Sequence, residues 1–180
     1  MRDGKLRWLR LSIALFSAKN KSRLSITDVS EIKFRVWLTD IDVSIMNHAA
    51  MMTVMEMGRI DYMVRTGFFK LARKKKWYFP IKSISAQFIR PLKLFQKANL
   101  ITRVFHVNES WFFIEQKIIR KGKIIAICIV KATVKKGKIS VPTNEILKEL
   151  NINELPIEGK NIIDSYEKEI NLVHKRLGKI

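Results

Sequence analysis

The sequence contains a single cysteine, Cys128, among its 180 residues. One cysteine excludes an intrachain disulfide and any metal cluster built from several thiolates. Its place in an apolar run predicts a buried, inert thiol. No stretch reaches the roughly 18 consecutive apolar residues of a membrane-spanning helix. These absences favour a cytoplasmic protein, with peripheral attachment at the inner membrane face left open.

Acidic residues are also scarce. The chain has 16 Asp and Glu against 35 Lys and Arg, which gives a formal charge of +19. A basic surface of this strength attracts nucleic acid, anionic lipid, an acidic carrier protein or a phosphorylated ligand. The cations are spread along the chain, and no zinc-finger, helix-turn-helix or RNA-recognition signature accompanies them. Nucleic acid is therefore an unlikely partner.

The first 30 residues differ from the rest of the chain. Residues 1–18 mix cations with apolar residues such as Trp8 and Phe16, which predicts a short amphipathic helix. This helix is too short and too charged to cross a bilayer, but it could lie on an anionic membrane surface. The alternative is a helix that packs on its own domain or on a partner subunit. Residues 19–30 are polar and predict a linker.

The central part of the chain combines strands with one unusual helix. Residues 31–38 alternate between polar and apolar, as a half-buried strand does. Asn47 is a favoured first residue for a helix over 47–65, which is apolar on most of its circumference and therefore predicted to be buried on most sides. A short helix follows over 68–76. Four strands separated by short turns then predict an antiparallel meander, over residues 78–89, 95–107, 111–120 and 124–135.

These elements predict an α+β protein in which a curled antiparallel sheet wraps around one long central helix, the hotdog fold. We expect three regions: the amphipathic segment and linker at 1–30, the hotdog domain at 31–140, and a C-terminal helical extension at 141–180.

Several short motifs resemble the 4-hydroxybenzoyl-CoA thioesterase-like family. Residues 36–50, Val-Trp-Leu-Thr-Asp-Ile-Asp-Val-Ser-Ile-Met-Asn-His-Ala-Ala, are similar to its opening motif, which is Asp-x-Asp, a short loop and His-x-Asn-Asn at the start of the central helix. Further matches lie at residues 56–59, 65–67, 88–95 and 111–116, so the resemblance covers about residues 31–140.

The resemblance implies the hotdog fold, a homodimer or dimer of dimers whose sheets join, and acyl thioesters of coenzyme A or acyl-carrier protein as substrates. It places the active site at the dimer interface, between the Asp-containing loop and the start of the helix. Plant-type acyl-carrier-protein thioesterases share the pattern Asp-Val-Asn-x-His. Against that pattern Asp42 matches the functional Asp, Ser44 stands in place of Asn, and Met46 stands in place of His. The Asn-Asn pair aligns with His48 and Ala49.

Hydrolysis of a thioester needs an activated nucleophile and donors that stabilise the carbonyl oxyanion. We predict Asp42 as the base or nucleophile, the helix N-terminal amides near His48 as donors, and Asn47 and His48 as substitute orienting groups. The same reading predicts no metal and no cofactor. The substrate contacts are expected from Met46, Ala49, Ala50, Arg73, Lys74 and Arg90, the last three toward coenzyme A phosphates.

Two other interpretations stay open at this point. The chain could be a non-catalytic hotdog protein that binds acyl thioesters, or an interaction or membrane-surface module. Each candidate residue also has a structural alternative: Asp42 could cap a tight turn, His48 could simply begin a helix, and the cations could form a solvated surface.

Overall fold

The computed structural model describes residues 3–152 and 158–177. Its helices are α1 (Asp3–Lys19), α2 (His48–Arg65), α3 (Phe68–Lys75), α4 (Thr143–Glu149) and α5 (Lys160–Leu177), with one 3-10 turn, η1 (Leu38–Asp40). Its strands are β1 (Ser30–Arg35), β2 (Ile41–Asp42), β3 (Ile45–Met46), β4 (Ile81–Phe88), β5 (Lys97–Val107), β6 (Phe112–Arg120), β7 (Lys123–Ala132), β8 (Lys135–Lys136) and β9 (Ile139–Ser140).

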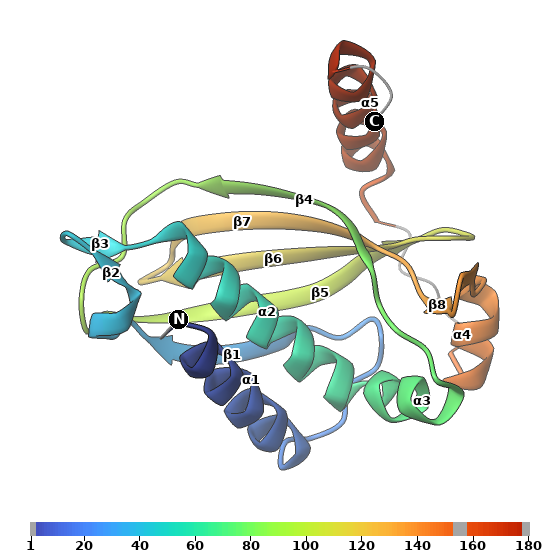
Figure 1. Ribbon diagram of the computed structural model, residues 1–180, viewed down its shortest axis with the longest axis horizontal. Coiled ribbons are helices and arrows are strands. Elements are labelled where there is room, and N and C mark those ends of the chain that lie inside the picture. Colours follow the sequence, from blue (N-terminus) through green and yellow to red (C-terminus); the bar gives the residue numbers. More distant parts are fainter. Residues whose placement is uncertain (1–2, 153–157, 178–180) are drawn as a thin grey trace.

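Five strands form one antiparallel sheet in the order β1-β5-β6-β7-β4. The sheet curves around α2, which crosses its concave face (Figure 1). The predicted α+β hotdog fold is confirmed. The expected alternation is visible in β5, where Ala98, Leu100 and Thr102 are buried beneath α2 and the residues between them are more exposed.

The predicted meander is correct for β5, β6 and β7 but wrong for β4. This strand pairs with β7, with Phe88 opposite Ala126, and not with β5. β5 instead pairs with β1, with Phe34 opposite Ala98. Alternation identifies a strand but not its neighbour. The connection over residues 89–96 crosses the end of the sheet, so β1 and β4 become its two edges (Figure 1).

Helix α2 approaches the sheet most closely at Gly58. A Cβ atom there would lie 2.5 Å from Leu100 Cδ2 and 2.6 Å from Thr102 Oγ1. Both neighbours belong to residues that are almost fully buried, so neither can move aside. Only glycine allows this spacing between helix and sheet.

Gly58→Ala is therefore expected to destabilise the protein even though alanine is the better helix former. The gain in helix propensity is about 1 kcal/mol. Overpacking a rigid core costs about 1–3 kcal/mol and can exceed that. We expect a net loss of up to about 2 kcal/mol in the free energy of unfolding, measured by chemical denaturation. An unchanged or raised midpoint would show that helix and sheet can separate here at no cost.

Helix α1 packs on its own domain. Leu11, Ala14 and Ala18 are buried against α2, and Arg10 forms an ion pair with the buried Asp40. The polar segment after α1 is also fixed, because the buried carboxylate of Asp61 in α2 binds groups from it. These are Lys21 Nζ at 2.6 Å and Ser30 Oγ at 2.6 Å, with Arg65 of α2 itself at 3.3 Å.

The two C-terminal helices cover different parts of the sheet. Ile146 and Leu147 of α4 complete the core cluster around Val107 and Phe112. α5 covers the convex face, where Ile163 and Tyr166 contact the outward side chains of β5 and β6. Residues 141–152 and 158–172 thus pack on the domain. The predicted break between the two helices falls partly on residues 153–157, which lie outside the described residues.

Candidate active site

Asp42 lies in a short hairpin that precedes α2. Strands β2 and β3 pair through Ile41 with Met46 and Asp42 with Ile45. Val43 at the tip has a positive φ of 56° and a fully exposed side chain, and the amide of Ser44 donates to the carbonyl of Asp42 at 2.6 Å. The tight turn leaves the Asp42 side chain exposed to solvent. Asp42 is therefore the accessible acid of the predicted motif.

The other acid of the motif, Asp40, has a structural role. Its side chain is buried, where it accepts from Arg10 and, at 2.9 Å, from the amide of Trp37. Its carbonyl accepts from the amide of Asn47 at 2.8 Å. Asp40 therefore fixes the base of the hairpin to the start of α2.

Asn47 caps α2. Its side-chain Oδ1 accepts from the amide of Ala50 at 2.6 Å, and its carbonyl accepts from the amide of Met51 at 3.1 Å. Within the part of the chain that the structure describes, no acceptor meets the amides of His48 and Ala49. These two amides, at the positive end of the helix dipole, are available to an oxyanion.

The remaining residues of the hairpin and helix start divide between surface and core. The His48 ring lies against Phe88 of β4, with ring centroids 4.4 Å apart. Ala49 is exposed, whereas Ala50 is buried and Met46 is only 1% exposed, and both belong to the main core cluster. Of the three expected substrate contacts next to Asp42 in the sequence, Met46, Ala49 and Ala50, only Ala49 is thus at the surface.

The three predicted phosphate-binding cations lie at opposite ends of α2. Arg90 is at the end of Asp42: it follows Phe88 by two residues and its guanidinium donates to the carbonyl of Ile124 at 2.6 Å. Arg73 and Lys74 lie on α3, after the C-terminal end of α2. The helix has 18 residues, which separates its ends by about 26 Å. One protomer therefore brings Arg90, but not Arg73 or Lys74, near Asp42.

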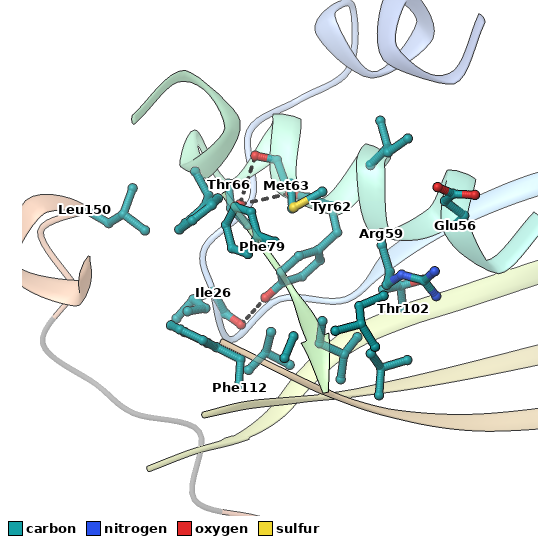
Figure 2. Close-up of a pocket in the computed structure, with 17 residues that line it drawn as sticks. Ile26, Glu56, Arg59, Tyr62, Met63, Thr66, Phe79, Thr102, Phe112 and Leu150 are labelled. Carbon is teal, nitrogen blue, oxygen red and sulfur yellow. Dashed lines mark hydrogen bonds between the residues drawn. The ribbon is translucent and has the colours of Figure 1, made fainter. Parts of the chain in front are cut away.

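A largely apolar cavity of about 210 Å³ lies between the C-terminal half of α2 and the sheet. Figure 2 shows Glu56 and Arg59 at one end, Leu150 at the other, and Tyr62 and Phe79 between them. The wall is completed by residues of β4, β5, β6 and β7, including Ile81, Thr102, Val104, Phe112, Ile114, Val130 and Ala132.

The few polar groups of the cavity are engaged with one another. Arg59 donates to Gln116 Oε1 at 2.6 Å, and Gln116 Nε2 donates to Thr102 and to the carbonyl of Met55. Burial lowers the pKa of the Arg59 guanidinium, although nearby Cys128 and Glu56 oppose this shift. Burial raises the pKa of Tyr62, whose hydroxyl donates to the carbonyl of Ile26. The cavity therefore presents a hydrophobic surface to any occupant.

Sequence reasoning missed most of this cavity because its wall comes from α2, α3, four strands and the segments that connect such elements. One signal lies in the methionines of the central helix, because flexible thioethers suit an adaptable pocket as well as a core. In the structure the methionines of α2 have both roles: Met63 lines the cavity, whereas Met51 and Met55 belong to the core.

Comparison with solved structures identifies the fold. A probable thioesterase from Bartonella henselae has a TM-score of 0.59 and 22% identity, over 64% of this chain and 98% of that one. The probable thioesterase YbaW from Escherichia coli has a TM-score of 0.62 and 18% identity, over 67% and 94%. The DHNA-CoA thioesterase from Staphylococcus aureus has a TM-score of 0.59 and 15% identity, over 84% and 96%.

Sequence comparison gives the family. No curated protein sequence matches the chain significantly. The family model of the thioesterase-like superfamily matches residues 36–150, which runs from the end of β1 to the end of α4 and includes the Asp42 hairpin, α2 and the whole cavity wall except Ile26. This match supports thioester hydrolysis as the general activity, and the chain belongs to the thioesterase-like superfamily.

Proposed function

We propose that the protein hydrolyses acyl thioesters of coenzyme A or acyl-carrier protein, with the acyl group in the cavity beneath α2 and Asp42 as the base or nucleophile. The observation that carries this proposal is the cavity itself. Small-molecule sites usually measure about 300–1,000 Å³. A space of about 210 Å³ suits an acyl group whose thioester and carrier stay outside. A relative named for a CoA thioester supports coenzyme A as the carrier.

The cavity and Asp42 lie at different ends of α2, and a dimer would bring them together. Strand β4 connects the two ends, because Ile81 lines the cavity and Phe88 contacts His48. If two copies of β4 pair antiparallel about a two-fold axis, the Phe88 end of one strand lies beside the Ile81 end of the other. Each site would then combine the cavity of one protomer with the Asp42 hairpin of its partner.

The exposed edge of β4 supports this dimer. The strand has eight residues with one charged side chain, Lys82, and its apolar residues Ile81, Ile84 and Phe88 are each about 40% exposed. An edge with few charges and exposed apolar side chains favours pairing with another chain. The opposite edge, β1, is protected, because Glu31, Lys33 and Arg35 place charges along its exposed side. A dimer through β4 therefore covers the vulnerable edge.

The proposed reaction needs only groups that these elements supply. Asp42 takes a proton from water as the water oxygen attacks the carbonyl carbon, and the amides of His48 and Ala49 stabilise the resulting oxyanion. The oxyanion then reforms the carbonyl, the carbon–sulfur bond breaks, and the thiolate takes the proton from Asp42. The products are a carboxylic acid and a free thiol. Alternatively, Asp42 attacks the carbonyl carbon directly and the carbon–sulfur bond breaks to release the thiolate. Water then cleaves the resulting anhydride, which frees the acid and Asp42, and the thiolate takes the remaining proton. Arg90 is placed at this end to meet a phosphate of the carrier.

The direct test is thiol release from a series of acyl-CoAs of increasing chain length and from acyl-carrier proteins. We expect hydrolysis of at least one acyl-CoA, with kcat/KM that rises with chain length until the cavity is full. If no acyl thioester is hydrolysed but acyl-CoA binds, the protein is a non-catalytic binding module. That second candidate has one observation in its favour: Met46 is buried and the Asn47 amide oxygen is used as a helix cap, so neither supplies an accessible catalytic group.

Filling the cavity should alter chain-length preference. Ile114→Phe adds an aromatic ring to the cavity wall, so we expect kcat/KM for the longest good substrate to fall about tenfold, the scale of one or two lost methylene contacts. The shortest substrate should be little affected. Ile101→Phe is the control, because Ile101 lies on the opposite face of the sheet. Equal losses for short and long substrates would place the acyl group elsewhere.

A further inference from the structure

Helix α1 carries apolar side chains on two opposite faces. One face, with Leu11, Ala14 and Ala18, is buried against α2. The other presents Leu9, Ile13 and Phe16, spaced as i, i+4 and i+7 along one side of the helix, with Trp8 beside them. These four side chains, the outer face of α1, are 56–71% exposed. A helix packed on its domain by one apolar face does not need a second one.

The proposed dimer leaves the outer face of α1 uncovered. α1 lies beside β1, where Ile13 and Ile32 share a groove, whereas the dimer forms at β4 on the other edge of the sheet (Figure 1). Among the described residues no helix is long and apolar enough to cross a membrane.

A basic groove adjoins the outer face. This groove, about 540 Å³ in volume, lies between the end of α1, the end of α2 and α3, and no carboxylate lines it. Two of its cations, Lys21 and Arg65, are paired with Asp61. The others form no ion pair with any residue that the structure describes, and these are Lys19, Arg23, Lys70, Arg73 and Lys74.

The two features form one surface. Lys19 belongs to the groove, and its Nζ lies 5.3 Å from the centroid of the Phe16 ring in the outer face. A convex row of tryptophan, leucine, isoleucine and phenylalanine flanked by lysine and arginine fits the boundary between lipid headgroups and acyl chains. Cations near an anionic bilayer add electrostatic attraction. A bilayer also needs no matching pocket, and Trp8, Leu9 and Phe16 stand exposed on the outer face of α1.

We propose that the outer face of α1 and the basic groove together dock the protein on an anionic membrane surface. Two ion pairs, Arg10 with Asp40 and Lys21 with Asp61, fix α1 and the segment after it to the domain. Binding of α1 to the membrane would therefore attach the whole domain. The outer face of α1 is separate from the proposed catalytic site, because α1 precedes the matched family region at residues 36–150.

The test is co-flotation of the full chain with vesicles. We expect binding to phosphatidylcholine vesicles that contain about 30 mol % phosphatidylglycerol and little binding to phosphatidylcholine alone. Raising the salt from about 0.1 M to about 1 M shortens the screening length from about 10 Å to about 3 Å and should release much of the protein. Failure to float with the anionic vesicles at low salt would overturn the proposal.

Two variants separate the apolar and electrostatic parts. Leu9→Gln with Phe16→Gln should lower the bound-to-free ratio at least about tenfold, because both side chains would leave the acyl region. Lys19→Ser, Arg23→Ser and Lys70→Ser together should lower it by about fivefold per cation. The matched controls are Ile139→Gln with Leu172→Gln, and Lys121→Ser, Lys136→Ser and Lys138→Ser together. All of these residues are exposed and lie outside the docking surface.

The other occupants give different results. If the outer face binds a second copy, the Leu9→Gln, Phe16→Gln variant changes the oligomeric state and loses no vesicle binding beyond its control. If the groove binds an acidic carrier protein instead, the parent chain binds the carrier and the cation variant does not. In that case neither the parent chain nor the variant floats with the vesicles. Either result would overturn the membrane assignment. Thiol release from a soluble short-chain acyl-CoA should be the same in all four variants, which keeps this test separate from that of the catalytic proposal.

Discussion

Asp42→Asn is expected to lower thiol release at least about 100-fold, the low end of the contribution of a positioned base. Asparagine keeps the size and hydrogen-bonding capacity of the side chain but removes its negative charge. Because the Asp42 side chain is exposed at the hairpin, the melting temperature should hardly change. The measurement is kcat/KM for the best acyl-CoA together with a thermal melt of the same sample. Full activity in Asp42→Asn would remove Asp42 from the mechanism.

Asp40→Asn is the matched control and should show the opposite result. Its carboxylate is buried against Arg10 and the amide of Trp37, so the loss of charge leaves the half-buried Arg10 poorly paired. We expect the free energy of unfolding to fall by about 1–3 kcal/mol. Any loss of activity should follow the folded fraction. Ser44→Ala, at the tip of the same hairpin, controls for disturbance of the turn. If Asp40→Asn lowers kcat at full stability, Asp40 would be the acid that acts.

Local patterns predicted the elements well because each depends on nearby residues. Asn47 begins α2 as expected, since its side chain caps the helix within one turn, and each of the four later strands was found at its predicted place. The position of β4 was not predictable in the same way. It depends on the path of the chain after Pro91 and on how the sheet closes around α2. The alternation of polar and apolar residues along a strand determines neither.

The candidate site shows the same limit. Asp42, Asn47 and His48 are neighbours in the sequence, so a motif could place them at one end of α2. Whether Met46 points to the site or to the core depends on the pairing of β2 with β3. Each of these strands has two residues, so alternation in the sequence does not show which side chain faces the core. The separation of Arg73 from Asp42 follows from the length of α2. The cavity needed tertiary packing, because its wall comes from residues between Ile26 and Leu150.

Ser85→Lys with Gln87→Lys is expected to separate the dimer and to abolish most of its activity. Both residues are exposed on β4. Near a two-fold axis the new lysines of one strand lie beside those of the other, and like charges across paired strands oppose the pairing. We expect the sedimentation of a dimer for the parent chain and of a 21.1 kDa monomer for the variant. Glu31→Lys is the control, since it changes the charge by the same +2 on the other edge.

The loss of activity in the separated variant should reach about 100-fold, because the cavity of one protomer would no longer meet the Asp42 of the other. Mixed dimers test this arrangement most sharply. Asp42→Asn chains lack the base, and Ile114→Phe chains have a filled cavity. In a mixed dimer one of the two sites joins an open cavity to an intact Asp42. An equal mixture, assayed with a long acyl-CoA, should therefore recover about a quarter of the parent activity, since half of the dimers are mixed and half of their sites are intact. If cavity and base belonged to the same chain, the mixture would show only the average of the two variants.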